Sequence, residues 1–516
     1  MPGAEEAVDE LADELLRTVL DHHPVLATLE GIPGHEGRLT DFGEEAEARF
    51  AARLDDLARR AGAVDPGPLG RTGRVTRDTI VQQATAHREQ VADRWVEFTI
   101  GDLVLTPVPL LLYALAVAPD EGRRAALPGH FRALADRHRS GIAHGRLPVR
   151  RLVEAAIALL DRNAALPGVA EYRSALVEDV LPHGRPDDRA GVCHLPDGER
   201  LYANAIRRHT TTDLTPDRLH RTGLEVLAAL EDEYRALGRE VFGTSDLAVV
   251  FAGLRDAPRF ADGEEMRVAA ERVVRRAEAA APRWFRRPPE HPCEVRLYPP
   301  GTAASTPPSY RMGAVDGSRP GTYSLNPGQP VQVHALEALT FHETVPGHHV
   351  DGSARLRRTD LPLLRRVAGL HAYSEGWALY AERLADEMGL YTDARSRLGM
   401  LVFDSMRAGR LVVDTGLHAF GWSRERAVAF LRESTPMPAE LVEAEVDRYL
   451  ADPGQALAYL VGRLEFQRLR ADAERRLGGA FDVGDFHEVV LSEARVPLST
   501  LGDLVEEWVQ SLVRRR

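Results

Sequence analysis

Lysine is absent from this sequence: all 65 basic residues are arginine, set against 78 acidic residues. The absence excludes chemistries that need an amine side chain, among them Schiff-base catalysis, covalent attachment of pyridoxal phosphate and the lysine of phosphate-binding loops. The formal net charge of −13 disfavours nucleic acid as a partner, because binding to phosphates needs a basic surface.

Cysteine and long apolar runs are scarce as well. Cys193 and Cys293 are too few for a disulfide framework or a four-cysteine zinc cluster. The longest apolar run, residues 103–117, contains Pro107 and Pro109 and is too short to span a bilayer. The first ten residues are acidic and lack the pattern of a secretory signal. These features predict a cytoplasmic protein with no membrane partner, and they leave the oligomeric state open.

Amphipathic helices dominate what is present. Apolar residues recur at three- and four-residue spacing, and Thr215 followed by Pro216 is typical of a helix start. This pattern predicts helices over residues 6–22, 43–61, 76–94, 110–117, 128–140, 147–163, 217–239 and 371–388. We expect residues 1–290 to form a helical lobe and residues 291–516 to form a metal-binding catalytic region, or one continuous domain with it. Strand-like runs at 294–298 and 321–326 predict a small antiparallel β-sheet.

A His-Glu pair followed by further histidines lies directly after these strands. His342 and Glu343 precede His348 and His349, a combination in which imidazoles hold a metal and the carboxylate activates its water. The same dipeptide recurs at His487 with no second histidine after it, so the dipeptide alone predicts nothing.

The spacing of this motif is unusual, because two histidines that share a zinc on a helix normally stand four residues apart. In a regular helix His348 would lie about 120° around the axis from His342, and His349 about 10 Å further along it. Pro346 lacks an N–H and Gly347 permits unusual backbone angles, so we expect the helix to break here. The break can bring His348 into the position of the second ligand, and His349 stays the alternative.

The sequence from His342 through Pro346-Gly347 to His348, followed by Glu375-Gly-Trp-Ala-Leu-Tyr-Ala-Glu382, resembles a bacterial family of unknown function numbered 885. That family is related to the gluzincin zinc metallopeptidases, such as thimet oligopeptidase and angiotensin-converting enzyme. The resemblance implies a mainly α fold with two helical lobes around a cleft and a small sheet beside the metal helix. It also implies one Zn²⁺ per chain and hydrolysis of peptides or related amides.

The resemblance further implies roles for individual residues. Glu375 corresponds to the third metal ligand, and Glu343 to the base that takes a proton from water and returns it to the leaving amine. The strand of Tyr323, Ser324 and Asn326 corresponds to a sheet edge that aligns substrate, although a structural hairpin is the alternative.

Later residues complete the expected site. Tyr459 and His418 are the candidate donors to the oxyanion, and Arg448 can pair with a substrate carboxylate or a neighbouring acid. Asp414, Glu382 and His349 are expected around the metal ligands, where Asp414 can orient a histidine.

The function predicted from these residues is zinc-dependent hydrolysis of a peptide or a small-molecule amide by metal-activated water. Two alternatives remain open. One is a different zinc-dependent hydrolysis or carbon–nitrogen cleavage of a small biosynthetic intermediate, and the other is a non-catalytic helical scaffold that retains the motif.

Overall fold

The computed structural model describes residues 3–103, 106–299, 307–314 and 319–515. Helices build the first half of the chain: α1 (Ala4–His22), α2 (Pro24–Glu30), α3 (Glu44–Ala63), α4 (Arg71–Ala92), α5 (Pro107–Val117), α6 (Glu121–Ala143), α7 (Arg150–Arg162), α8 (Val169–Ala175), α9 (Gly198–Thr210), α10 (Pro216–Phe242), α11 (Leu247–Arg255) and α12 (Gly263–Ala280). All the helices expected in this half are present, which confirms the mainly helical fold.

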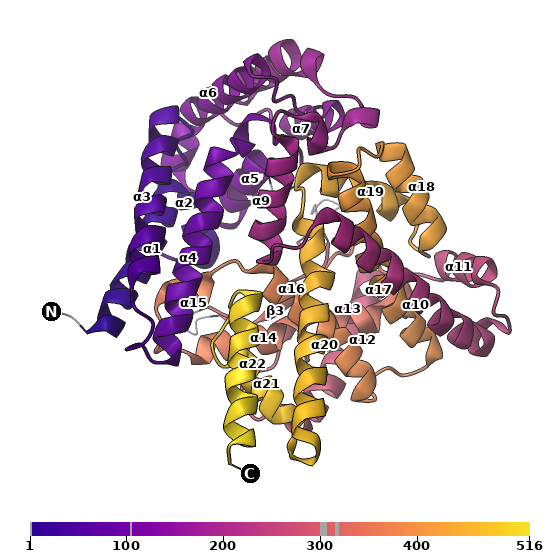
Figure 1. The fold of residues 1–516 in the computed structure, drawn as a ribbon. Helices are drawn as coiled ribbons and strands as arrows, with labels where there is room; N and C mark the ends of the chain where they lie inside the picture. Colours follow the sequence, from indigo (N-terminus) through magenta and orange to yellow (C-terminus); the bar gives the residue numbers. More distant parts are fainter. Residues whose placement is uncertain (1–2, 104–105, 300–306, 315–318, 516) are drawn as a thin grey trace.

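Three short strands and a second set of helices follow. The strands are β1 (Glu294–Leu297), β2 (Ser309–Arg311) and β3 (Thr322–Leu325). The helices are α13 (Leu336–Glu343), α14 (His348–Arg357), α15 (Leu363–Val367), α16 (His371–Glu387), α17 (Ala394–His418), α18 (Arg424–Ser434), α19 (Ala439–Ala451), α20 (Ala458–Leu477), α21 (Val483–Leu491) and α22 (Leu498–Val513). Figure 1 shows α13, α14 and α16 near the middle of the view, to the right of the indigo N-terminal helices.

Side-chain caps explain where two of these helices begin. The hydroxyl of Thr215 accepts a hydrogen bond from the N–H of Arg218 at 3.3 Å, and this bond starts α10 as expected. The sequence placed the start of α6 at Pro128, but α6 begins at Glu121 and holds Pro128 inside it. The carboxylate of Asp120 accepts from the N–H of Arg123 at 2.8 Å, so this earlier cap decides the start.

The sheet is mixed, and the prediction of an antiparallel sheet was wrong. Its strand order is β1-β3-β2, in which β1 runs parallel and β2 antiparallel to β3. The sequence pattern missed β2, which follows Pro307 and Pro308 and has only three residues. With β2 present, β3 becomes the central strand and has no free edge.

The largest hydrophobic core crosses the boundary expected near residue 290. Tyr202 from α9 and Phe341, Trp377 and Phe466 from the C-terminal helices belong to this one cluster of buried side chains. Among the described residues, no helix is long and apolar enough to cross a membrane. Helix α5 covers most of the apolar run of residues 103–117, while residues 104–105 lie outside the described part of the chain.

Candidate metal centre

The helix that carries the motif is interrupted between its two histidines. Helix α13 ends at Glu343 and α14 begins at His348. Pro346 cannot donate a backbone hydrogen bond, and a Cβ on residue 347 would lie 1.9 Å from the carbonyl oxygen of His342. Only glycine fits at Gly347, so Pro346 and Gly347 together enforce the break. The break expected from the sequence is confirmed.

Trp377 of α16 forms hydrogen bonds with the backbone between α13 and α14. Its indole N–H donates to the carbonyl oxygens of Pro346 at 3.1 Å and of Gly347 at 3.2 Å. The Trp377 side chain is fully buried. A buried carbonyl without a partner would cost free energy, so these bonds stabilise the interrupted backbone and tie it to α16.

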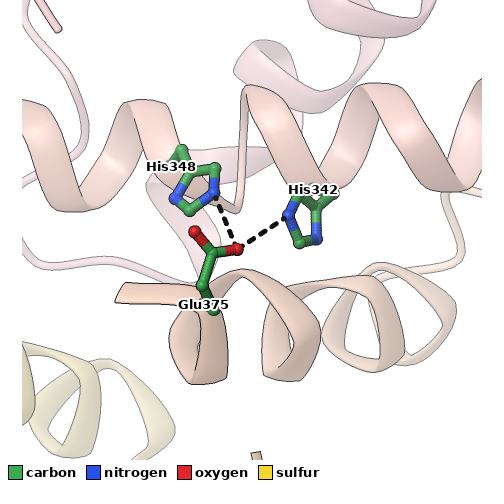
Figure 2. Close-up of side chains that lie close together, drawn as sticks. All are labelled: His342, His348 and Glu375. Atoms are coloured by element: carbon green, nitrogen blue, oxygen red, sulfur yellow. Dashed lines mark ion pairs between the residues drawn. The ribbon is translucent and has the colours of Figure 1, made fainter. Parts of the chain in front are cut away.

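The interruption brings three potential ligands together. One nitrogen or oxygen atom from each of His342, His348 and Glu375 lies within 4.8 Å of the other two. The Oε2 atom of Glu375 is 3.5 Å from Nε2 of His342 and 3.6 Å from Nε2 of His348. Figure 2 shows both rings turned toward the carboxylate, which projects from α16.

This arrangement fits a zinc ion. Zinc takes histidine nitrogens and carboxylate oxygens at about 2.0–2.2 Å, and donors at two corners of such a tetrahedron lie about 3.4 Å apart. The two distances to Glu375 agree with that separation. Two histidines and a glutamate supply three donors, which is the number that catalytic zinc sites take from the protein.

Glu382 supports the cluster from behind His342. Its Oε1 lies 2.8 Å from Nδ1 of His342, and its side chain is fully buried. A hydrogen bond at Nδ1 fixes the ring and leaves Nε2 to face the cluster. Although burial lowers the pKa of His342, the bonds to Glu375 and Glu382 raise it to about 9. The surroundings of the His342 ring therefore favour a positive charge at this position.

Glu343 lies beside the three ligands and is held in place by the sheet. Its Oε2 accepts a hydrogen bond from the backbone N–H of Tyr310 in β2 at 2.8 Å. Burial raises the pKa of Glu343, against the lowering effect of His342 and His348. A carboxylate with a raised pKa is a stronger base, which suits a residue that takes a proton from water.

Comparison with known proteins adds the family. A family model described as "Bacterial protein of unknown function (DUF885)" matches residues 160–505, a range that contains the whole cluster. The chain belongs to this family. No curated protein matches the DUF885 chain.

Two solved structures share the fold of the DUF885 chain. A "putative lipoprotein" from Colwellia psychrerythraea is 25% identical, with a TM-score of 0.85 over 99% of this chain and 100% of that one. A "putative lipoprotein of unknown function" from Shewanella oneidensis is 16% identical, with a TM-score of 0.76 over 98% of this chain and 100% of that one. The second likeness concerns the fold alone.

The geometry favours His348 over His349 as the second ligand of the DUF885 site. Both ring nitrogens of His349 have other partners: Nδ1 lies 3.0 Å from the hydroxyl of Tyr310, and Nε2 lies 2.8 Å from the carbonyl oxygen of His291. Tyr310 thus contacts both Glu343 and His349, yet the sequence analysis missed it. Its only signal was a short β-forming triplet after two prolines.

The strand expected to align substrate does not offer an edge. Tyr323 and Asn326 are buried, and Ser324 pairs with β1 on one side and β2 on the other. The expectation of an edge strand here was wrong, because β2 covers this strand and itself forms the edge next to Glu343.

Two residues expected near the ligands have other partners. Nδ1 of His418 accepts from the N–H of Val192 at 3.2 Å, and Nε2 donates to the carbonyl oxygen of Tyr449 at 3.1 Å. No ring N–H of His418 is left for an oxyanion. Asp414 accepts from the hydroxyl of Tyr202 at 2.6 Å and from the N–H of Gly454. Among the described residues no hydrogen bond joins Asp414 to a histidine, contrary to expectation.

Tyr459 lies at the start of α20, and Arg448 of α19 is close enough for its charge to act on the phenol. The ring of Tyr459 packs 4.4 Å from the guanidinium of Arg410. Burial raises the pKa of Tyr459, and the charge of Glu375 raises it further, so the phenol stays protonated. The effect of Glu375 also means that Tyr459 lies near the cluster. Arg448 forms an ion pair with Glu445 at 3.1 Å. The sequence offered a substrate carboxylate or a neighbouring acid as its partner, and the structure pairs it with the neighbouring acid.

Proposed function

We propose that this protein is a zinc-dependent hydrolase that cleaves peptide or related amide bonds. The observation that carries the proposal is the cluster of His342, His348 and Glu375, with the buried carboxylate of Glu343 next to it. The family likeness of the motif to the gluzincin peptidases supports it, and we infer a gluzincin-like arrangement of two helical lobes on the same basis.

The residues of the cluster would hold zinc through Nε2 of His342, Nε2 of His348 and the carboxylate of Glu375. When bound, the metal supplies Lewis acidity, which polarises a carbonyl and lowers the pKa of water. Glu343 accepts the proton of the attacking water and returns it to the leaving amine. The N–H of Tyr310 holds the Glu343 carboxylate in place during both transfers. Tyr459 donates a hydrogen bond to the carbonyl oxygen as negative charge develops on it.

The proposal is tested by combining metal analysis with a substrate screen. We expect one zinc per chain and hydrolysis of internally quenched peptides that a chelator abolishes and added zinc restores. Hydrolysis of small amides without any cleavage of peptides would favour the alternative of a small biosynthetic intermediate. A zinc-free chain with no turnover on either set would refute the proposal and favour a non-catalytic scaffold.

We also propose a cytoplasmic location, on the basis of the scarcity of cysteine. The descriptions of the two similar structures as lipoproteins make the envelope the competing location. Fractionation of the native cell with an antibody to the protein decides between them, because recovery in the membrane fraction would contradict the proposal.

A further inference from the structure

A pair of stacked histidines lies one helical turn from Glu375. His371 is the first residue of α16, four positions before Glu375, so the two side chains lie on the same face of the helix. The ring of His209, near the end of α9, stacks on that of His371 with centroids 5.4 Å apart. Their Nδ1 atoms are 3.3 Å apart. For a hydrogen bond to form between them, one of the two nitrogens must carry a proton and the other must accept.

Arg208 decides which nitrogen of His209 carries the proton. Its Nη2 and Nε atoms lie 2.9 and 3.2 Å from Nε2 of His209. Because a guanidinium can only donate, Nε2 of His209 must accept. Oδ1 of Asp452 lies 3.3 Å from Nη2 of Arg208 and also 3.3 Å from Nε2 of His209. Both donors of Arg208 are closer to Nε2 than this oxygen is, and a proton on Nε2 would face them, so we assign the carboxylate to the guanidinium as its acceptor. His209 is neutral, since burial lowers its pKa to about 4, and its proton is therefore on Nδ1.

The nitrogen that carries the proton in His371 follows from the one that carries it in His209. The Nδ1–H of His209 donates to Nδ1 of His371, so the proton of a neutral His371 is on Nε2. Burial lowers the pKa of His371, which keeps the ring neutral, while the charge of Glu375 acts in the opposite direction. Among the described residues none forms a hydrogen bond with Nε2 of His371. The Nε2–H group of His371 is therefore a hydrogen-bond donor without a partner among the described residues. It lies on the same helix face as Glu375, a proposed metal ligand.

We propose that His371 is a further catalytic residue, whose Nε2–H donates a hydrogen bond to the carbonyl oxygen of the bound amide. Arg208 and His209 are positioning residues that fix its tautomer from α9, a helix that packs against α16. No proton is transferred in this role, because the hydrogen bond only stabilises the charge that develops on the oxygen. The inference rests on the proposed function, and it gives His371 the role that the sequence assigned to His418.

Kinetics of substituted enzymes test the role of His371. We expect His371→Phe to lower kcat on quenched peptides by about 10²–10³-fold, the effect of losing one such donor, with KM and zinc content unchanged. His371→Gln should recover part of this loss, because its amide N–H reaches close to the position of Nε2. His220→Phe, which replaces a half-buried histidine bonded to Thr415, is the control and should keep the original kcat.

The tautomers themselves give a readout that does not depend on activity. Nitrogen-15 NMR of the histidine-labelled protein should show the proton of His209 on Nδ1 and that of His371 on Nε2. His209→Asn keeps an N–H near the Nδ1 position and should preserve the tautomer of His371, whereas His209→Asp places an acceptor there and should reverse it and lower kcat.

The failure of this inference differs from the failure of the proposed function. A proton on Nδ1 of His371 in the unsubstituted chain, or an unchanged kcat in a zinc-loaded His371→Phe variant, would overturn the inference alone. Absence of both zinc and hydrolysis from the unsubstituted chain would overturn the proposed function together with the catalytic role of His371.

Discussion

The Oε1 atom of Glu382 lies 2.8 Å from Nδ1 of His342, although the two residues are 40 positions apart in the sequence and lie on different helices. Since Glu382 fixes the ring of a proposed ligand, Glu382→Gln should lower zinc affinity by about 10–100-fold while the fold persists. Zinc titration and melting curves measure both effects. Glu387→Gln on the same helix removes an exposed carboxylate paired with Arg470 and is the matched control. Equal zinc affinity in the two variants would contradict the role of Glu382.

The two adjacent histidines should respond differently to substitution. His348→Ala removes a member of the cluster, so its loss of zinc affinity should exceed the loss caused by Glu382→Gln. His349→Ala removes the contacts with Tyr310 and His291, and its effect on zinc should be smaller. Zinc titrations of both variants decide between them. Full retention of zinc by the His348 variant would show that His349 is the ligand.

Glu343→Gln separates chemistry from metal binding. Because an amide cannot accept a proton from water, turnover should fall to background, while zinc content and melting temperature stay unchanged. Glu488→Gln makes the same change in the second His-Glu dipeptide, which lies outside the cluster, and should keep full turnover. Loss of zinc from the Glu343 variant would mean that this carboxylate is a ligand and not the base.

Tyr459→Phe tests the phenol as a donor to the carbonyl oxygen. We expect kcat to fall by about 10²–10³-fold with little change in melting temperature, because the phenyl ring can still pack against Arg410. Measurement of kcat, KM and zinc content on one preparation checks this. Unchanged turnover would leave Tyr459 with a packing role only.

Asp414 gives the protein a predictable pH dependence of stability. Burial raises the pKa of Asp414 from 3.8 to about 7, so the folded state holds this proton more tightly than the unfolded state does. The contribution of Asp414 is therefore complete below about pH 4 and is lost as the pH rises toward 7. Asp414→Asn should have a higher melting temperature than the original protein at pH 8, and the difference should be smaller at pH 5. An equal difference at both values would contradict the raised pKa.

Much of the fold and the cluster was predictable from the sequence because the signals are local. The spacing of apolar residues predicted the ends of α1, α3, α4 and α7 to within five residues, since periodicity reports one buried face directly. The break at Pro346 and Gly347 was predictable for the same reason: the missing N–H and the missing Cβ act on their own backbone.

The errors concern residues whose position depends on distant partners. Nothing in the segment of Tyr323 shows that β2 would cover its free side, because strand pairing is decided between segments. His418 and His371 are equally isolated histidines in the sequence. Their contacts separate them: His418 bonds to the backbone carbonyl of Tyr449, whereas His371 contacts His209 through Nδ1 and has no hydrogen bond at Nε2 among the described residues.

Helix α16 contributes Glu375 to the cluster and, two residues later, Trp377 to the carbonyl oxygens of the interruption. A shift of this one helix would therefore displace the carboxylate and release the turn between the two histidines at the same moment. We therefore expect the proposed metal binding and the docking of α16 to be one cooperative event, in which the free energy of coordination would stabilise the contact of α16 with α13 and α14 as well.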